Sequence, residues 1–172
     1  MMNGRRGLLA GLGTCGVLAG ASASLFPRPG AISPAAAAPA AERFAVERTE
    51  AEWRRLLTPA QFAVLRGHGT ERAGSSPLDG EKRRGPFACA GCGLPAFPSD
   101  AKFDSGTGWP SFSRPIDGAV GTSVDRSFLM ARTEVHCARC GGHFGHVFDD
   151  GPPPTGKRYC MNGVALAFGA ES

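Results

Sequence analysis

The spacing of apolar residues predicts two short helices near the start of the folded region. In residues 49–57, "TEAEWRRLL", Thr49 and Glu52 have the spacing of a capping box, which marks the beginning of a helix. Residues 58–69, "TPAQFAVLRGHG", repeat this signal and place a proline at the first helical position. Gly67 is a suitable stop. Both helices are expected to serve mainly as packing elements.

Beyond residue 69 the pattern changes to one typical of β-structure. Glycine and proline recur every few residues, and the apolar runs are too short for helices. The runs 119–124 and 127–137 predict the two strands of a hairpin, with Asp125 and Arg126 as its turn. Further strands are predicted at "GHVF", "RYCM" and "VALAF". The chain is therefore predicted to fold as a mainly β domain with two N-terminal helices.

Residues 1–41 differ in composition from the rest of the chain. They contain no acidic residue, and a mildly apolar run follows Arg5 and Arg6. This order is typical of an export signal, and the arginine pair resembles the twin-arginine type. The segment "PRPGAISPAAAAPAA" behind it has the composition of a flexible spacer. We predict a periplasmic protein with its folded domain at 42–172 and no stable membrane span after processing. Lipid attachment at Cys15 is the less favoured alternative.

Two CxxC pairs give the strongest signal for a metal site. Cys89 and Cys92 lie in "CAGC", Cys137 and Cys140 lie in "CARC", and a glycine follows each pair. Two tight turns with two thiolates each complete the tetrahedral set that Zn²⁺ prefers. Disulfides within such pairs would close very small loops, and a redox CxxC usually begins a helix. One structural zinc ion per chain is therefore predicted.

Cys160 lies outside both pairs, in "KRYCMNG". On a strand Arg158 and Asn162 would share its face, and a guanidinium there favours the thiolate. Asp150 follows His146 by four residues, which is close enough for the carboxylate to orient the imidazole. These groups form a set suited to nucleophilic and acid–base chemistry. A buried structural thiol, and a hairpin turn at "NG", remain open as alternatives.

Two neighbouring segments add further candidates. His143 lies in "GGHFGHVFDDG", where it is either a member of the same site or an extra metal ligand. Trp109 lies in the glycine-rich segment "KFDSGTGWPSF", with Phe112 nearby. These two aromatic residues are candidates either for the apolar wall of a binding site or for the core.

Together these stretches resemble the B-type peptide methionine sulfoxide reductases. The matching segments run from 52 to 168 and include "EWRRLLTPAQFAVLRGHGTER", "CAGCG", "KFDSGTGWPSF" and "CARCGGHFGHVFDDGPPPTGKRYCMN". The resemblance implies a β-tent of two antiparallel sheets with a distal four-cysteine zinc site. It also implies an enzyme that reduces methionine-R-sulfoxide in oxidised proteins or peptides to methionine.

By motif position the resemblance makes Cys160 the nucleophile that attacks the sulfoxide and becomes a sulfenic acid. His146 is then the expected general acid, because the sulfoxide oxygen must receive a proton. The other expected site residues are Arg158, Asp150, Asn162 and His143, with Trp109 and Phe112 around the methyl group of the substrate.

One position departs from the pattern of many members. Thr107 stands where they carry a cysteine that attacks the sulfenic acid, and a hydroxyl cannot do this. We therefore expect an external thiol, either a small thiol or a thioredoxin-like protein, to reduce Cys160 directly. The chain is expected to act as a monomer.

Two functions of other classes compete with this interpretation. The first is a non-catalytic zinc-binding module, for example for nucleic acid, and the second is a thiol–disulfide oxidoreductase that uses one CxxC. A nucleic-acid partner is not expected, because the three leader arginines account for most of the formal charge of +4. Both alternatives also leave the histidines and the tryptophan segment without a role.

Overall fold

The computed structural model describes residues 43–127 and 130–171. The predicted export signal, its arginine pair, Cys15 and the spacer lie outside the described residues, so these stay predictions. Within the described ranges no helix is both long and apolar enough to cross a membrane. All of the described residues belong to one structural unit, 41–172.

Two capped helices open the described region, as predicted. Helix α1 spans Glu50–Leu56 and helix α2 spans Pro59–Leu65. The backbone N–H of Glu52 donates to the Thr49 hydroxyl, and the Glu52 carboxylate accepts in return from the backbone of Thr49. An equivalent capping box starts the second helix. Each box satisfies two backbone donors that a helix start leaves free.

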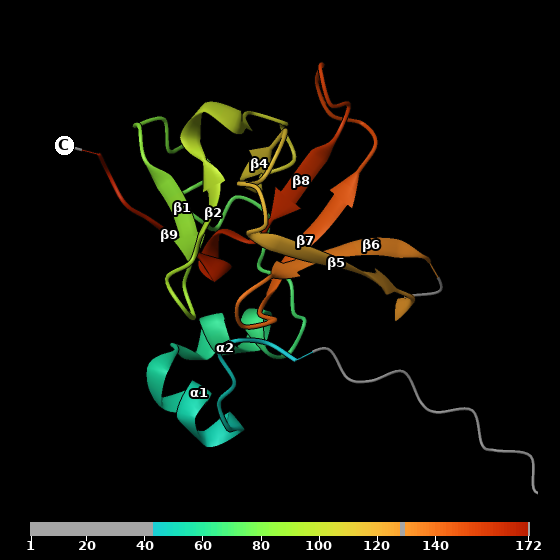
Figure 1. Cartoon of the computed structure of the whole chain (residues 1–172). Helices are drawn as coiled ribbons and strands as arrows, with labels where there is room; N and C mark the ends of the chain where they lie inside the picture. Colours follow the sequence, from blue (N-terminus) through green and yellow to red (C-terminus); the bar gives the residue numbers. More distant parts are fainter. Residues whose placement is uncertain (1–42, 128–129, 172) are drawn as a thin grey trace, which may run out of the picture. The chain divides into compact units, whose positions relative to one another are not determined.

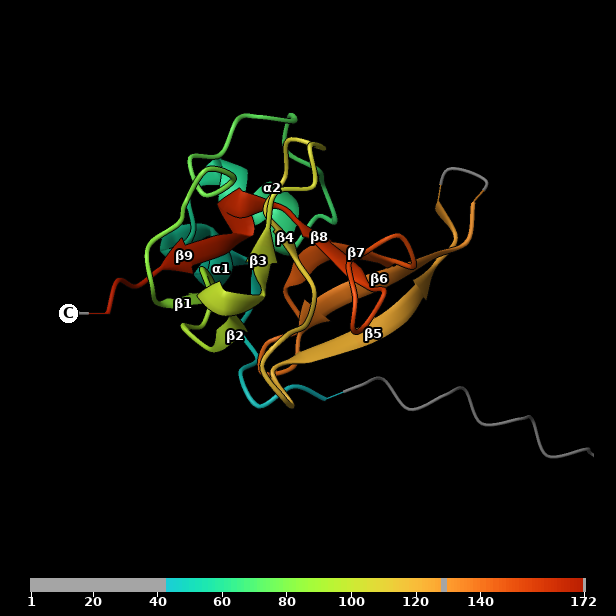
Figure 2. The same ribbon diagram turned by 90° about the horizontal axis from the view of Figure 1, so that it is seen from above.

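In the described part of the chain, nine strands form two antiparallel sheets (Figure 1). The smaller sheet has the order β2-β1-β9, with bounds Pro95–Pro98, Pro86–Cys89 and Leu166–Phe168. The larger has the order β3-β4-β8-β7-β6-β5, with bounds Lys102–Phe103, Ser111–Phe112, Arg158–Met161, His143–Phe148, Arg132–Cys137 and Val120–Asp125. Figure 2 shows β5, β6, β7 and β8 side by side. The predicted mainly β fold with two antiparallel sheets and two short helices is confirmed.

The structure corrects two details of the predicted strands. Asp125 is the last residue of β5 and pairs with Arg132 of β6, so it does not form the hairpin turn. The segment "VALAF" begins inside a 3-10 turn, η3 (Gly163–Ala165), and only its last three residues form a strand. Strands β1 to β4 were not predicted, because they have two to four residues each and two of them begin with proline.

Aromatic side chains fill the space between the sheets. The rings of Phe97 and Phe112 stack with centroids 4.6 Å apart, and Phe87 meets Phe112 edge-on at 5.0 Å. Phe144 of β7 contacts the same cluster, and all four rings are fully buried. Each such side chain contributes about 1.5–3 kcal/mol through its removal from water. This core holds β4, β7 and β8 in place. Of the candidate catalytic residues, His143 and His146 lie on β7, and Arg158 and Cys160 lie on β8.

Candidate active site and metal centre

The four paired cysteines come together at the ends of two strand pairs. Cys89 ends β1 and Cys137 ends β6, while Cys92 and Cys140 follow in the turns behind them. The Sγ atoms of Cys89 and Cys140 are 3.7 Å apart, those of Cys92 and Cys137 are 3.5 Å apart, and all four lie within 4.8 Å of one another. Four thiolates at about 2.3 Å from a tetrahedral ion would be about 3.8 Å apart. The residues therefore fit a metal ion.

The two CxxC turns have the same backbone geometry. The N–H of Gly93 donates to the carbonyl of Cys89 at 2.8 Å, and the N–H of Gly141 donates to that of Cys137 at 2.8 Å. Both glycines have positive φ, 72° and 67°. This conformation strains other residue types, which explains why a glycine follows each pair.

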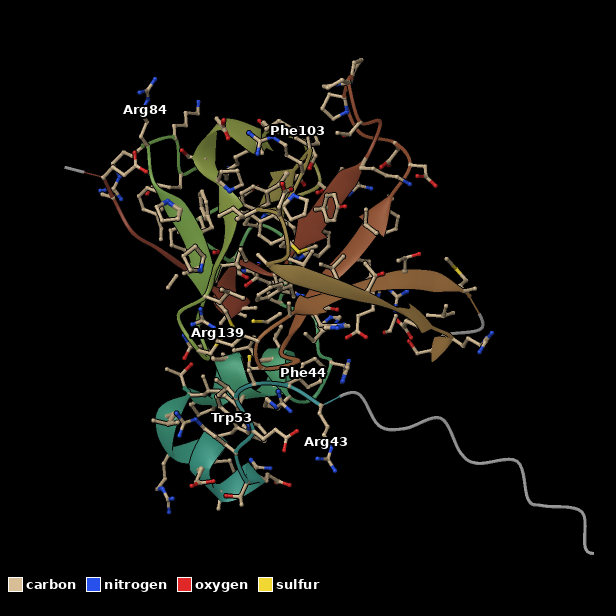
Figure 3. The ribbon with its side chains drawn as sticks, in the orientation of Figure 1. Arg43, Phe44, Trp53, Arg84, Phe103 and Arg139 are labelled. Atoms are coloured by element: carbon tan, nitrogen blue, oxygen red, sulfur yellow. The ribbon has the colours of Figure 1, made fainter. Side chains whose placement is uncertain are left out.

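The surroundings of the cluster tie it to the helices. The Arg66 guanidinium, just after α2, donates to the carbonyl of Cys140 at 2.9 Å. Figure 3 shows Trp53 in the helical layer and Arg139, from the second CxxC turn, above it. Hydrogen bonding to Cys137, Cys140 and Cys92, together with burial, raises the pKa of the Cys89 thiol far above its ordinary range. Without a cation, the four thiols do not ionise together.

A second, separate site surrounds Cys160. It is a cavity of about 130 Å³ that opens beside β7 and β8. It is lined by residues from distant parts of the sequence: Thr70, Trp109, Arg132, Gly145, His146, Phe148, Cys160 and Asn162. Four of the predicted site residues, Trp109, His146, Cys160 and Asn162, therefore share one cavity.

The Cys160 thiol lies among hydroxyl groups. Cys160 pairs with Ser111 across β4 and β8, and its Sγ is 3.9 Å from Oγ1 of Thr107. Ser105 links the two hydroxyls, with its Oγ 2.8 Å from each. Burial raises the pKa of Cys160 above its ordinary value, although Thr107, Arg158 and Ser111 act in the opposite direction. Arg158 therefore favours the thiolate, as predicted, but desolvation prevails.

The carboxylate partners differ from the predicted ones. Asp150 does not orient His146; it forms a bidentate ion pair with Arg158, with N···O distances of 2.9 and 2.8 Å. Nε2 of His146 lies 2.8 Å from Oδ2 of Asp125, at the end of β5. The sheet brings Asp125 to His146 across β6, whereas Asp150 lies beyond the end of β7 and points to β8.

His143 does not line the cavity and belongs to a second network, in which His143 and Glu134 are buried. Its Nδ1 is 2.7 Å from Oε1 of Glu134, which also lies 2.9 Å from Nδ1 of His68. The Ser123 hydroxyl donates to the other carboxylate oxygen. Burial raises the pKa of Glu134, but the bonds from Ser123 and His143 outweigh this and hold it below its ordinary value. Burial lowers the pKa of His143, which keeps the imidazole neutral.

Asn162 and Trp109 are both held by the main chain of Glu71. Oδ1 of Asn162 accepts from the N–H of Glu71 at 2.9 Å, and its Nδ2 donates to the carbonyl of Phe144 at 2.9 Å. Nε1 of Trp109 donates to the carbonyl of Glu71 at 3.2 Å. Asn162 precedes η3 and is buried, so the hairpin turn suggested by "NG" is not formed.

Phe112 does not line the cavity. It is fully buried between the sheets, against Phe97 and Phe87, and the prediction of a substrate-binding role for it is wrong. Besides Trp109, the aromatic residue that lines the cavity is Phe148, and the Arg158 guanidinium lies 4.5 Å from the centre of its ring.

The residues at this site that were not found from the sequence include Asp125, Glu134, Glu71 and Phe148. Strand alternation offered a partial signal for the last one, because Phe148 and His146 are two residues apart and share a face of β7. The pairing of Glu134 with His146 depends on the register of β6 and β7, which a β-bulge between Val135 and His136 shifts. Sequence spacing alone does not give that register.

The geometry agrees with comparisons to known proteins. Residues 57–170 match the SelR domain family. A peptide methionine sulfoxide reductase MsrB of Methanosarcina barkeri is 55% identical over 128 residues, which cover 74% of this chain and 90% of the relative. Proteins of the same name from Agrobacterium fabrum and Leptospira interrogans are 52% and 47% identical, over 72% and 74% of this chain and 92% and 98% of the relatives.

Proposed function

Because this chain belongs to the family of B-type peptide methionine sulfoxide reductases, we propose that it reduces the R epimer of methionine sulfoxide with Cys160 as the nucleophile. The observation that supports this most directly is the cavity that joins a thiol, a carboxylate-bound imidazole and an indole. As a family member the chain is an oxidoreductase that acts on sulfur in oxidised proteins, with a thiol as the source of electrons.

The reaction begins at the sulfur of Cys160. Its thiolate attacks the sulfoxide sulfur, and the sulfoxide oxygen takes up a proton. The oxygen then passes to the cysteine as the bond to the methionine sulfur breaks, leaving Cys160 as a sulfenic acid and the substrate as methionine. The cysteine loses two electrons and the sulfoxide gains them. A thiol that keeps its proton until substrate binds, as the raised pKa of Cys160 implies, supplies the proton that the oxygen requires.

His146 is the group that carries this proton. It lines the cavity with Cys160, and Asp125 holds its Nε2 at 2.8 Å. Hydrogen bonds from the side chain and backbone of Ser127, and then from His146, hold the pKa of Asp125 below its usual range. A permanent carboxylate fixes the orientation of the imidazole ring through which the proton passes.

Trp109 and Phe148 form the apolar side of the cavity and would bind the methyl group of the sulfoxide. The sulfoxide oxygen would then point to His146, and only one epimer satisfies both contacts at once. The indole is fixed by its bond to Glu71, which supports a choice by shape. This arrangement supports selectivity for a single epimer of the sulfoxide.

The oxidised enzyme is reduced by an external thiol, either a small thiol or a thioredoxin-like protein. Thr107 lies beside Cys160 with a hydroxyl that cannot form a disulfide. The remaining described cysteines form the metal cluster. These two facts support direct reduction of the sulfenic acid at Cys160.

Two further assignments complete the proposal. The metal ion is Zn²⁺, one per chain, because four thiolates in a closed tetrahedral set are typical of structural zinc. The chain is exported to the periplasm by a signal within residues 1–41 and acts there as a monomer on oxidised exported proteins. The order of arginines, apolar run and small residues in that segment supports export.

The test is to offer the separated R and S epimers of N-blocked methionine sulfoxide with dithiothreitol as the reductant. We expect turnover of the R epimer only, and none by a Cys160→Ser protein that is folded and metal-loaded. Turnover of neither epimer by the folded wild-type protein would reject the catalytic assignment. A non-catalytic zinc module would then be the better description.

A further inference from the structure

A second cavity adjoins the one that contains Cys160. Its volume is about 540 Å³, within the range of about 300–1,000 Å³ that is typical of ligand sites. Helix α2 forms one side, the segment after Gly74 another, and η3 with β9 the floor. Its wall is mainly aliphatic: Ala60, Ala63, Val64, Pro77, Leu78 and Val164.

The two cavities share their walls at two places in the chain. Thr70 lines both of them. Asn162 lines the cavity of Cys160, and the next two residues, Gly163 and Val164, line the larger one. The Glu71 carboxylate accepts from the N–H groups of these two residues at 2.6 and 2.9 Å, so the shared wall is fixed.

The volumes of the two cavities indicate which part of the substrate each one can hold. About 130 Å³ is enough for the side chain of methionine sulfoxide but not for the polypeptide that carries it. That polypeptide must therefore leave the smaller cavity over its rim. At Thr70 this rim meets the larger, aliphatic cavity. A neighbouring apolar side chain would find there a surface that is otherwise exposed to water.

We infer that the larger cavity is an extended substrate site that binds an apolar side chain next to the methionine sulfoxide of the target polypeptide. This inference rests on the proposed function and adds a substrate class to it. The preferred substrates are unfolded or exposed segments in which the oxidised methionine has an aliphatic or aromatic neighbour. A single blocked amino acid would use only the smaller cavity.

The test compares three substrates with one reductant, dithiothreitol, so that docking of a protein reductant plays no part. They are blocked methionine-R-sulfoxide and two short peptides with the sulfoxide at the centre, flanked by leucines or by serines. We expect kcat/KM for the leucine peptide to exceed that for the serine peptide about tenfold, as expected for one buried aliphatic side chain.

The variant Ala63→Glu places a charge in the aliphatic wall from an exposed position on α2. It should abolish the leucine preference while kcat/KM for the blocked amino acid stays within about twofold of wild type. Ala51→Glu, at an exposed position on α1 that does not line the cavity, is the matched control and should keep the preference. Circular dichroism and thermal midpoints of the variants confirm that they are folded.

Three results would overturn the inference while leaving the proposed reaction at Cys160 intact. The first is equal kcat/KM for the two peptides in the wild-type protein. The second is an Ala63→Glu protein that loses activity on the blocked amino acid as much as on the leucine peptide. The third is a wild-type dimer in sedimentation that Ala63→Glu dissociates, which would assign the cavity to a second copy of the chain. Failure to reduce the blocked amino acid would instead reject the proposed function.

Discussion

Oγ1 of Thr107 lies 3.9 Å from Sγ of Cys160. A sulfur atom in place of that hydroxyl would lie at about van der Waals contact with Sγ of Cys160, and a small side-chain movement would bring the two to the bond length of a disulfide, about 2.05 Å. Thr107 precedes β4, whose Ser111 pairs with Cys160 of β8. Thr107→Cys is therefore expected to form an intramolecular disulfide with Cys160 after one turnover, which mass spectrometry and thiol titration would detect. The wild-type protein should form no such bond. A disulfide to Cys160 in wild-type protein after one turnover would contradict direct reduction by an external thiol.

The pKa of Cys160 should govern its reactivity in the free enzyme. Because burial raises this pKa above the ordinary 9.0, the thiol is neutral at pH 7 and ionises only as the pH rises past that value. Alkylation by iodoacetamide should then accelerate with pH and reach its midpoint above pH 9. Quantification of the modified Cys160 peptide gives the rate. A midpoint below the ordinary value would show that the guanidinium outweighs desolvation.

Arg158 and Asp150 should move this midpoint in opposite directions. Arg158→Met removes the positive charge that favours the thiolate and should raise the midpoint further. Asp150→Asn removes the carboxylate that neutralises the guanidinium and should lower it. The same alkylation series measures both. Shifts in the same direction would show that the ion pair acts through structure and not through charge.

Asp125 should matter more to the chemical step than Asp150. Asp125→Asn keeps the shape but removes the charge at His146, and we expect kcat to fall at least about tenfold, as is typical for the partner of a working imidazole. The pH dependence of kcat should also change. Asp150→Asn, which leaves His146 untouched, is the control. A larger loss of kcat in the control would show that the ion pair of Asp150 with Arg158 matters more to the chemical step than the carboxylate at His146.

Removal of the metal should destabilise both sheets. At a free metal concentration about 1,000 times its Kd, binding contributes about 4 kcal/mol, which corresponds to roughly 15 °C in the thermal midpoint of a domain of this size. We expect chelation, or Cys137→Ser, to lower the midpoint by about this amount, with elemental analysis giving one zinc per wild-type chain. An unchanged thermal midpoint in metal-free protein would show that the metal ion does not stabilise the fold.

The sequence was informative where a signal is local. Thr49 with Glu52 marked a helix start through neighbouring backbone groups, and the two CxxC pairs marked a metal cluster through their own turns. The sequence was not informative where a contact depends on the register of the sheet. The partner of His146 is 21 residues away and is reached only through the pairing of three strands. Phe112 was misplaced for the same reason, since the packing of β4 turns it into the core.

Glu71 links the two sides of the cavity that contains Cys160. Its N–H bonds to Asn162, its carbonyl to Trp109 and its carboxylate to the N–H of Gly163. The cavity wall is thus assembled before any substrate arrives, and little of the binding energy is lost to ordering it. A preformed cavity of this size cannot extend itself toward a sulfoxide inside a folded target. Whether a damaged methionine is repaired should therefore be decided by the target protein, through the free energy of opening the segment around that residue.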